Sequence, residues 1–554
     1  MTTPNIGTTY LSVALLLALL VSSCTPVTHF DVVEATISDM QQAMEEGRLT
    51  SRDLVTAHLS RIARYEEEVN AAIAINSHAL ADADRLDRER IERGIRGPLP
   101  GIPVALKDNI HTTDLPTTGG TLAFDGYVPP SEATLTTHLR EAGAIIIAKT
   151  VMTELANFMA RGMPGNYSAV GGFGLNPYDP RRDPRTGRND GRPVMGTGGS
   201  SSGIGTAASF WAANVGTETS GSILSPSNAN MLVGIKPTVG RVRRWGVIPI
   251  TADQDTAGPM ARTVTDAAIL LGVLEGTEPD PHDVATSRCE VPPYGDYTAF
   301  LRPEGLQGAR SGIPRAFYYD PVTAPGAEQP RERLSEAGRR VMNEAIMILR
   351  QQGATIIDPA DIPSVVDPVA EHNLLASGGE SSVLAYGMKR DFNAWLGTLG
   401  TSAPVKTLTE LREWNLEQES AGTLKYQQAR LDGADALDME AARDAYDSDR
   451  ARDLRLNGEH GIDEVMRTLE LDALLFPGAS GAAISARAGY PSVIVPFAFV
   501  AEEFDPPMPE GFETKPRPFG VSFAGGACSE PRLLELAYAF EQATLRRVPP
   551  PDMP

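Results

Sequence analysis

The chain has 554 residues, of which 42% are hydrophobic and 22% charged, and its formal net charge is −22. This is the composition of a globular protein, and it excludes collagen-like, coiled-coil and wholly disordered chains. The excess of 71 acidic over 49 basic residues argues against a nucleic-acid partner, because phosphate binding needs a concentrated positive field.

The amino terminus carries a short apolar run, residues 11–21, which is too short to span a bilayer as a helix. Two serines follow it and precede Cys24, an arrangement that resembles a bacterial lipoprotein signal. We therefore predict a signal peptide over 1–23, lipid on Cys24, and export to the periplasmic side of the membrane or the cell envelope. An ordinary secretory signal and an uncleaved anchor are the alternatives, and residues 1–10 lack the basic residues that such signals normally carry.

The cysteines and histidines do not indicate a metal site. Three cysteines are too few for a disulfide scaffold, and they are too scattered for zinc, as are the eight histidines. We expect no metal and no cofactor. If lipid takes Cys24, the remaining Cys289 and Cys528 form either a disulfide or two buried thiols.

The first part of the chain predicts helices followed by short buried strands. Residues 31–95 have a helical pattern, in which Thr50 to Asp53 has the chemistry of a capping box. Beyond a turn cluster at 97–101, apolar runs predict strands at 102–106 and 144–148, with a helical stretch at 131–142 between them.

The later part continues this alternation. Residues 176–195 are rich in Pro, Gly, Arg and Asp and predict an exposed loop, whereas 328–460 is mostly helical. The remaining expected elements are strands at 473–476, 492–497 and 520–524 and a helix at 530–545. Strands alternating with helices predict an α/β sheet buried on both faces, and no linker divides 31–548, so we expect one domain.

Two Gly/Ser-rich clusters, at 196–205 and 217–226, are the most unusual feature, and a helical run at 206–213 is expected to join them. Small residues at this density let the backbone approach a ligand closely. A phosphate-binding loop is disfavoured because no lysine follows the glycines. A plain flexible linker is disfavoured because a helix joins the clusters.

A nucleophile elbow is the third alternative, since Gly199 to Gly203 matches G-x-S-x-G around Ser201. That interpretation needs an apolar strand before the glycine and an acid and a histidine after it. No such strand is present, and the only later histidines are His282, His372 and His460.

A serine nucleophile without histidine needs another base, and a lysine can serve if burial lowers its pKa. Lys107 ends a predicted strand, where the active sites of α/β proteins gather. The alternative is a surface lysine paired with Asp108.

These residues resemble the amidase signature family, and within it bacterial peptide amidases more than the transfer-RNA amidotransferase subunit. The segments that carry the resemblance are Gly101–Asn109, Gly198–Gly203, Gly216–Ser222, Val233–Arg241, Gln254–Arg262 and Phe519–Gly526. The resemblance covers about 31–548. It implies a single large α/β domain with a mixed central sheet covered by helices on both faces.

The resemblance also implies a role for each matching residue. Ser222 matches the nucleophile, Lys107 the base, and Ser200 the serine that bridges them, which lies at a cis peptide bond in the family. The backbone N–H groups in the stretch from Thr219 to Ser222, with Thr219, Ser220 and Gly221 as the expected donors, match the oxyanion hole. Lys149 and Lys236 are expected to be structural.

The predicted function is hydrolysis of carboxamide bonds, in small molecules or peptide amides, through an acyl-serine intermediate. The alternatives are an amidotransferase-type subunit that supplies ammonia to a partner, and a catalytically inactive family member. We expect no nucleic-acid partner and membrane contact only through the lipid on Cys24.

Overall fold

A computed structural model of the chain describes residues 30–95, 97–276, 278–331, 334–376 and 381–553. The predicted signal peptide and Cys24 lie outside these residues. No helix within the described ranges combines the length and the apolar character needed to cross a bilayer.

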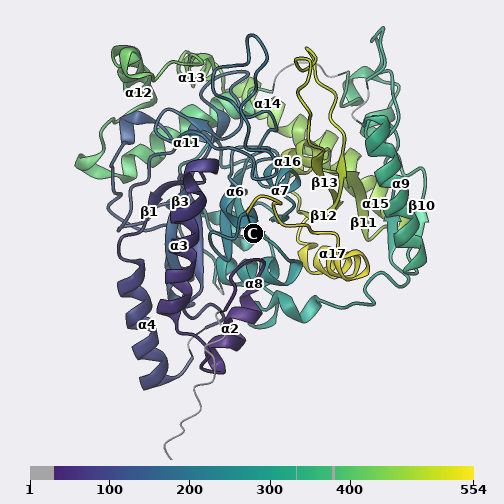
Figure 1. Ribbon diagram of the computed structural model, residues 1–554. Helices are drawn as coiled ribbons and strands as arrows, with labels where there is room; N and C mark the ends of the chain where they lie inside the picture. The colour runs from purple at the N-terminus through teal and green to yellow at the C-terminus, as the bar shows by residue number, and fades with distance from the viewer. Residues whose placement is uncertain (1–29, 96, 277, 332–333, 377–380, 554) are drawn as a thin grey trace, which may run out of the picture.

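One mixed sheet of eleven strands runs through the molecule (Figure 1). In their order across the sheet the strands are β1 (Ala72–Ile75), β3 (Ile145–Thr150), β2 (Pro103–Lys107), β6 (Ala213–Glu218), β8 (Thr256–Ala261), β7 (Val233–Lys236), β12 (Ser492–Val500), β13 (Arg517–Ala524), β11 (Ala473–Pro477), β9 (Arg310–Gly312) and β10 (Thr355–Ile357). β2 is parallel to both of its neighbours, whereas β8 is antiparallel to β6 and β7. The predicted single α/β domain with a mixed sheet is confirmed.

Helices cover both faces of this sheet. The longer ones are α2 (Ile37–Glu45), α3 (Ser51–Val69), α4 (Ala79–Arg93), α5 (Thr134–Glu141), α8 (Val264–Glu275), α9 (Glu336–Gln351), α11 (Val383–Thr398), α12 (Leu408–Glu417), α14 (Arg443–Leu454) and α17 (Glu530–Thr544). Successive side chains of a strand point to opposite faces. Accordingly Ile145 and Ile147 pack with α3 and α4, while Ile146 joins the cluster that contains α2, α8 and α17.

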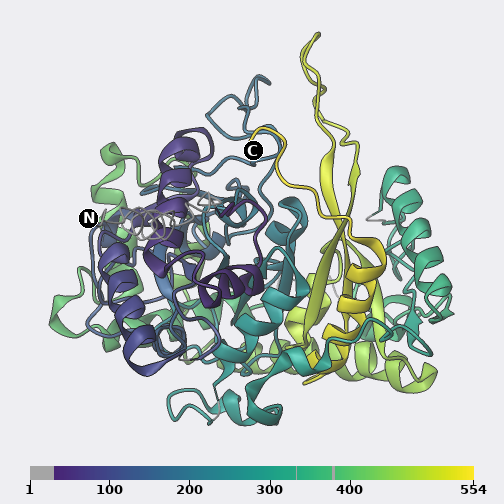
Figure 2. The ribbon, with the colours of Figure 1, turned by 60° about the horizontal axis from the view of Figure 1, so that its bottom comes forward.

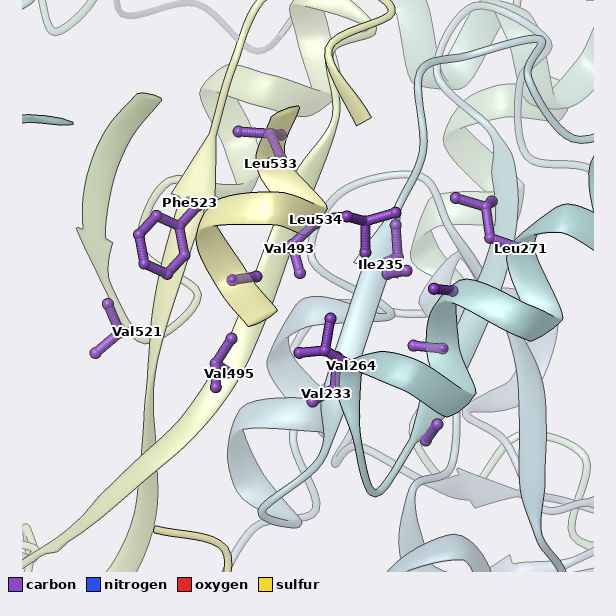
Figure 3. Packing of buried hydrophobic residues seen from close by; sticks show 14 of the residues in the cluster. Val233, Ile235, Val264, Leu271, Val493, Val495, Val521, Phe523, Leu533 and Leu534 are labelled. Atoms are coloured by element: carbon purple, nitrogen blue, oxygen red, sulfur yellow. The ribbon is translucent and has the colours of Figure 1, made fainter. Parts of the chain in front are cut away.

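The largest core cluster lies where α8 and α17 pack on the middle of the sheet (Figure 3). Val233 and Ile235 of β7 face α8, and Val493 of β12 lies next to Leu534 of α17. All of these side chains are fully buried, and β-branched residues suit such strands because they pack well on a pleated surface.

Most elements expected from the sequence are present. The five predicted strands are β2, β3, β11, β12 and β13, and the closing helix is α17. Thr50 caps α3, and it exchanges hydrogen bonds with Asp53 in the predicted capping box.

The predicted helix at 206–213 is wrong. Its first residues form the short helix α6 (Ile204–Ala207), and Ala213 already begins β6. Ser209 has a φ of 57°, which ends the helix, and the chain turns so that the Trp211 ring packs directly on Gly205. A Cβ on Gly205 would lie 2.1 Å from that ring, so only glycine fits there.

The loop at 176–195 is less exposed than predicted. Three of its five arginines pair with aspartates two positions earlier, as Arg181–Asp179, Arg185–Asp183 and Arg192–Asp190, at 2.6–2.8 Å. The loop then packs on residues 501–516, an arm that connects β12 to β13 and projects from the body (Figure 2). Arg181 lies over the ring of Phe512 at 4.3 Å and Arg185 over that of Phe504 at 4.9 Å. Ion pairing inside the loop leaves the flat guanidinium faces free to cover these rings.

The sequence left open whether Cys289 and Cys528 form a disulfide or remain two buried thiols. Cys289 and Cys528 form a disulfide across 239 residues of sequence, with their Cα atoms 5.5 Å apart. It joins the segment after α8 to the turn that precedes α17.

Candidate active site

Lys107 is the last residue of β2, and its side chain is fully buried. Its Nζ donates hydrogen bonds to Thr217, at 2.8 Å to Oγ1 and 3.2 Å to the carbonyl oxygen, and lies 3.1 Å from Ser200 Oγ. The alternative of a surface lysine paired with Asp108 is wrong, because Asp108 instead pairs with Lys149 at 3.2 Å.

The environment of Lys107 favours the neutral amine. Burial lowers the pKa of Lys107 to about 7, although the negative charges of Asp255 and Glu218 act in the opposite direction. A neutral amine has two N–H groups and one lone pair. In the neutral amine the two contacts with Thr217 use both N–H groups and leave the lone pair for the hydroxyl of Ser200, whereas the charged amine donates to Ser200 Oγ. Lys107 can therefore accept a proton from Ser200 near neutral pH.

Ser200 lies between Lys107 and Ser222. Its side chain is buried, and its Oγ is 2.8 Å from Ser222 Oγ. The structure thus brings together the three residues predicted from the sequence, in one continuous chain of hydrogen bonds, which we call the Lys–Ser–Ser chain.

Two glycines allow the Ser200 loop to reach Ser222. Gly198 has a φ of +95°, and a Cβ there would lie 2.4 Å from the carbonyl oxygen of Ser225. A Cβ on Gly199 would lie 2.9 Å from Ser222 Cα. Any larger residue at these two positions would push Ser200 and Ser222 apart. The glycines were expected to let the backbone approach a ligand, and in the structure they let the Ser200 segment approach the Ser222 segment.

The turn that carries Ser222 is held by one carboxylate. Glu218, at the end of β6, accepts hydrogen bonds from the backbone N–H groups of Gly221, Ile223 and Leu224 at 2.7–2.9 Å. Three such bonds fix the turn between β6 and the short helix α7 (Leu224–Ala229). Ser222 follows directly after Gly221, so its position depends on this carboxylate.

These bonds alter the predicted oxyanion hole. The N–H of Gly221 donates to Glu218 and is therefore already occupied. The N–H groups of Thr219, Ser220 and Ser222 meet no acceptor among the described residues. Of the predicted stretch from Thr219 to Ser222, only the N–H of Gly221 is therefore not available as a donor.

The cis peptide bond that the family resemblance implied at Ser200 is not present. Among the described residues the cis bonds are Asp358–Pro359 and Asp505–Pro506, so both peptide bonds of Ser200 are trans. Both cis bonds precede proline, where the cis form is far less unfavourable than before other residues.

The nucleophile-elbow alternative fails at Ser201. The Ser201 hydroxyl donates to the carbonyl oxygen of Thr217 at 2.9 Å and accepts from the Thr217 N–H at 3.1 Å. None of the later histidines touches it within the described residues. His460 is bonded to Asp367 and Glu464, and His282 stacks on Trp245.

Sequence reasoning missed several residues that shape this site. Thr217, Glu218, Asn109 and Gln254 were recognised only as parts of family-like segments. Asn109 donates to Thr217 Oγ1 at 3.0 Å and so positions the acceptor of Lys107. The signal that could have found Glu218 and Thr217 is their place at the carboxyl end of a strand, but β6 was not predicted.

A cavity of about 240 Å³ borders the same strand ends. Its walls are mostly apolar, from residues such as Ile248, Ile250 and Trp395, and Thr217 and Thr219 are also among its lining residues. It therefore reaches the segment that precedes Ser222.

The comparisons with known proteins agree with this geometry. The model of the Amidase family matches residues 53–534. A probable amidase of Arabidopsis thaliana is 36% identical over 528 residues, which are 94% of this chain and 92% of that protein. The solved structure of native peptide amidase from Stenotrophomonas maltophilia matches with a TM-score of 0.78 and 35% identity, over 95% of this chain and 99% of that one.

A glutamyl-tRNA(Gln) amidotransferase subunit from Synechococcus is also similar, at 29% identity over 92% of this chain and 96% of that protein. The family resemblance found in the sequence is confirmed, and peptide amidases are among the similar solved structures. The family match spans nearly the whole described chain and includes the Lys–Ser–Ser chain. The chain therefore belongs to the amidase signature family of hydrolases.

Proposed function

We propose that this chain hydrolyses carboxamide bonds through an acyl-serine intermediate, with Ser222 as nucleophile, Ser200 as bridge and Lys107 as base. The observation that carries the proposal is the unbroken Lys–Ser–Ser chain, 3.1 and 2.8 Å between its polar atoms, ending at a lysine whose burial lowers the pKa to about 7.

In the acylation step, Ser222 Oγ attacks the amide carbon. Its proton passes to Ser200, and the proton of Ser200 passes to Lys107. The carbonyl oxygen becomes negative, and the open N–H groups of Thr219, Ser220 and Ser222 are suited to stabilise it. Lys107, now charged, returns a proton through Ser200 to the departing nitrogen, which leaves as ammonia or an amine.

In the second step, water attacks the acyl-serine. Water gives a proton to Ser200, whose own proton passes to Lys107. The bond between the acyl carbon and Ser222 Oγ then breaks, and Lys107 returns a proton through Ser200 to that oxygen. The chain then returns to its starting state, with Lys107 neutral and the carboxylic acid released.

The test is hydrolysis by the purified chain alone. We expect ammonia release from a peptide amide, in line with the similarity to peptide amidase, and none from the Ser222→Ala variant at equal folded content. A mass increase on Ser222 equal to the acyl group should be trapped by rapid acid quenching. Wild-type activity in Ser222→Ala would contradict its role as nucleophile.

The same assay separates the second candidate function. The similarity to an amidotransferase subunit favours a chain that supplies ammonia to a partner protein. Such a protein should release little ammonia until its partner and the acceptor substrate are added. Turnover by the chain alone would favour the hydrolase, and no turnover under any of these conditions would favour an inactive family member.

We further propose that the chain is exported and carries lipid on Cys24. The apolar run and the small residues before Cys24 support this, as does the Cys289–Cys528 disulfide, because disulfides persist in oxidising compartments. Mass spectrometry on protein from its native host should find Cys24 as the lipidated first residue. Recovery of the intact 1–23 segment would contradict the proposal, and Cys24→Ser should stay unprocessed or lose its anchor.

A further inference from the structure

Thr219, three residues before Ser222, is held from two sides by the residues that precede β8. Gln254 Nε2 donates to the Thr219 carbonyl oxygen at 3.1 Å, and the Gln254 side chain is only 3% exposed. On the other side, Thr219 Oγ1 donates to Asp255 Oδ1 at 2.5 Å. Both polar groups of Thr219 beyond its N–H are therefore fixed by neighbouring residues.

Asp255 is itself held rigidly. Its Oδ2 accepts hydrogen bonds from the backbone N–H groups of Ile250 and Thr251 at 2.8 and 2.9 Å. The contact between Asp255 and Thr219 thus anchors the side chain of Thr219 to a fixed segment of backbone. Gln254 holds the peptide group that follows.

The bond from Gln254 determines where the next N–H points. The peptide between Thr219 and Ser220 is trans, and in a trans peptide the C=O and N–H directions are opposite. Fixing the carbonyl oxygen of Thr219 therefore fixes the N–H of Ser220 on the side away from Gln254. Ser220 is exposed, and its N–H meets no acceptor among the described residues, so it is open to a ligand.

We infer that Gln254 is a positioning residue for the transition state. It orients the Thr219–Ser220 peptide so that the Ser220 N–H meets the substrate's carbonyl oxygen as negative charge develops there. The inference rests on the proposed function, since it presupposes attack by Ser222. Gln254 itself touches neither the substrate nor the Lys–Ser–Ser chain.

The expected effect follows from the strength of such donors. Removing one oxyanion donor lowers kcat by about 10²–10³-fold. Releasing the peptide leaves the donor present but poorly directed, so we expect the loss of kcat to be smaller, about 10–100-fold. KM should change little, because the ground-state carbonyl needs this donor less than the developing oxyanion does.

The test variant is Gln254→Met, which keeps the length of the side chain and removes its donor. The matched control is Gln428→Met. Gln428 is also 3% exposed and also donates to a backbone carbonyl, that of Arg412, at 3.2 Å. Gln428 Oε1 also accepts a hydrogen bond from Asn415 Nδ2 at 3.1 Å, so Gln428→Met should lose at least as much stability as Gln254→Met. Only Gln254→Met should lose kcat.

The affinities of two inhibitors distinguish a positioning role of Gln254 from a merely structural one. The probes are the aldehyde and the alcohol that correspond to the amide used in the hydrolysis assay. Ser222 Oγ adds to the aldehyde carbon, and the C=O π electrons move to the aldehyde oxygen. The Oγ proton passes to Ser200, whose own proton passes to Lys107. The alcohol cannot form this adduct. For Gln254→Met, aldehyde affinity should fall by about the same factor as kcat/KM, while alcohol affinity stays at the wild-type value.

Either of two results would overturn the inference. In one, Gln254→Met binds the aldehyde as tightly as wild type. In the other, aldehyde and alcohol affinity fall equally, which would indicate a distorted binding site. The Ser222→Ala variant distinguishes a failure of this inference from a failure of the proposed function. If that variant still hydrolyses the amide, or still prefers the aldehyde, the proposed nucleophile is wrong and the inference falls with it.

Discussion

The ends of β2 and β3 lie side by side in the sheet, and each carries a fully buried lysine, yet their surroundings differ. Leu106 pairs with Lys149 in the ladder, so Lys107 lies one position further along. Lys149 meets a carboxylate, Asp108, at 3.2 Å, whereas within the described residues Lys107 meets only hydroxyl and carbonyl oxygens. Burial lowers the pKa of both amines. The difference indicates that a buried lysine is a candidate base where no carboxylate stabilises its charged form and a serine hydroxyl lies within hydrogen-bond distance.

The sharpest way to break this comparison is to replace Lys107 with arginine. A guanidinium keeps the charge but cannot lose its proton in this pH range. We expect Lys107→Arg to be as inactive as Lys107→Ala, with kcat/KM lower than wild type by about 10²–10⁴-fold. Turnover of one amide by both variants, with circular dichroism to confirm folding, measures this. Substantial activity in Lys107→Arg would mean that the base is elsewhere.

The pH dependence should follow the proton on Lys107. Activity requires the neutral amine, whose pKa burial lowers to about 7, so the active fraction falls about tenfold for each pH unit below that value. We expect kcat/KM for the free enzyme to rise with pH and level off above about 7. The measurement is a kcat/KM profile, with incubation controls for stability. A flat profile between pH 5.5 and 7.5 would exclude a lysine base with this pKa.

Lys149 tests the other half of the comparison. Lys149→Met leaves the buried carboxylate of Asp108 without its ion pair, which should lower the free energy of unfolding by about 3–5 kcal/mol. The folded fraction should keep a kcat close to wild type. Urea unfolding measures the loss, and the double variant Lys149→Met/Asp108→Asn should recover part of it. A loss of kcat beyond the loss of folded protein would give Lys149 a catalytic role.

Lys236 is the third case and should give the smallest effect. It is fully buried, burial lowers its pKa to about 8, and its Nζ donates to the backbone carbonyls of Pro237 and Tyr490. No serine hydroxyl lies among its hydrogen-bond partners in the described part of the chain. Lys236→Met should therefore keep full activity. The free energy of unfolding should fall by about 1–3 kcal/mol, because the two buried backbone carbonyls lose the Lys236 amine as their hydrogen-bond donor. A drop in kcat/KM in the folded variant would contradict this comparison, because Lys236 would then contribute to catalysis without contacting a serine hydroxyl.

The sequence predicted the elements whose local pattern agrees with their final state. Strands such as β3 and β12 are continuous apolar runs, which need no tertiary information to recognise. β6, β7 and β8 were missed because their short sequences contain glycine, proline or charged residues, which local pattern does not associate with a central strand. Their burial comes from neighbours that are distant in the chain.

The candidate site divides in the same way. The identities of Lys107, Ser200 and Ser222 followed from resemblance, and the structure brings their side chains together. The roles of Glu218 and Gln254 depend on which backbone groups their side chains reach. Neither composition nor spacing contains that information, because it is set by how the turn after β6 folds onto the residues before β8.

The Cys289–Cys528 link makes a covalent ring of the segment that contains β9 to β13. A single cut anywhere within this ring, including the projecting arm, would leave the two pieces joined. The strands that the ring contributes to the sheet would then stay attached to the rest of the molecule after such a nick. In a surrounding rich in proteases, the molecule could be cleaved once and still keep its strands assembled around the active site.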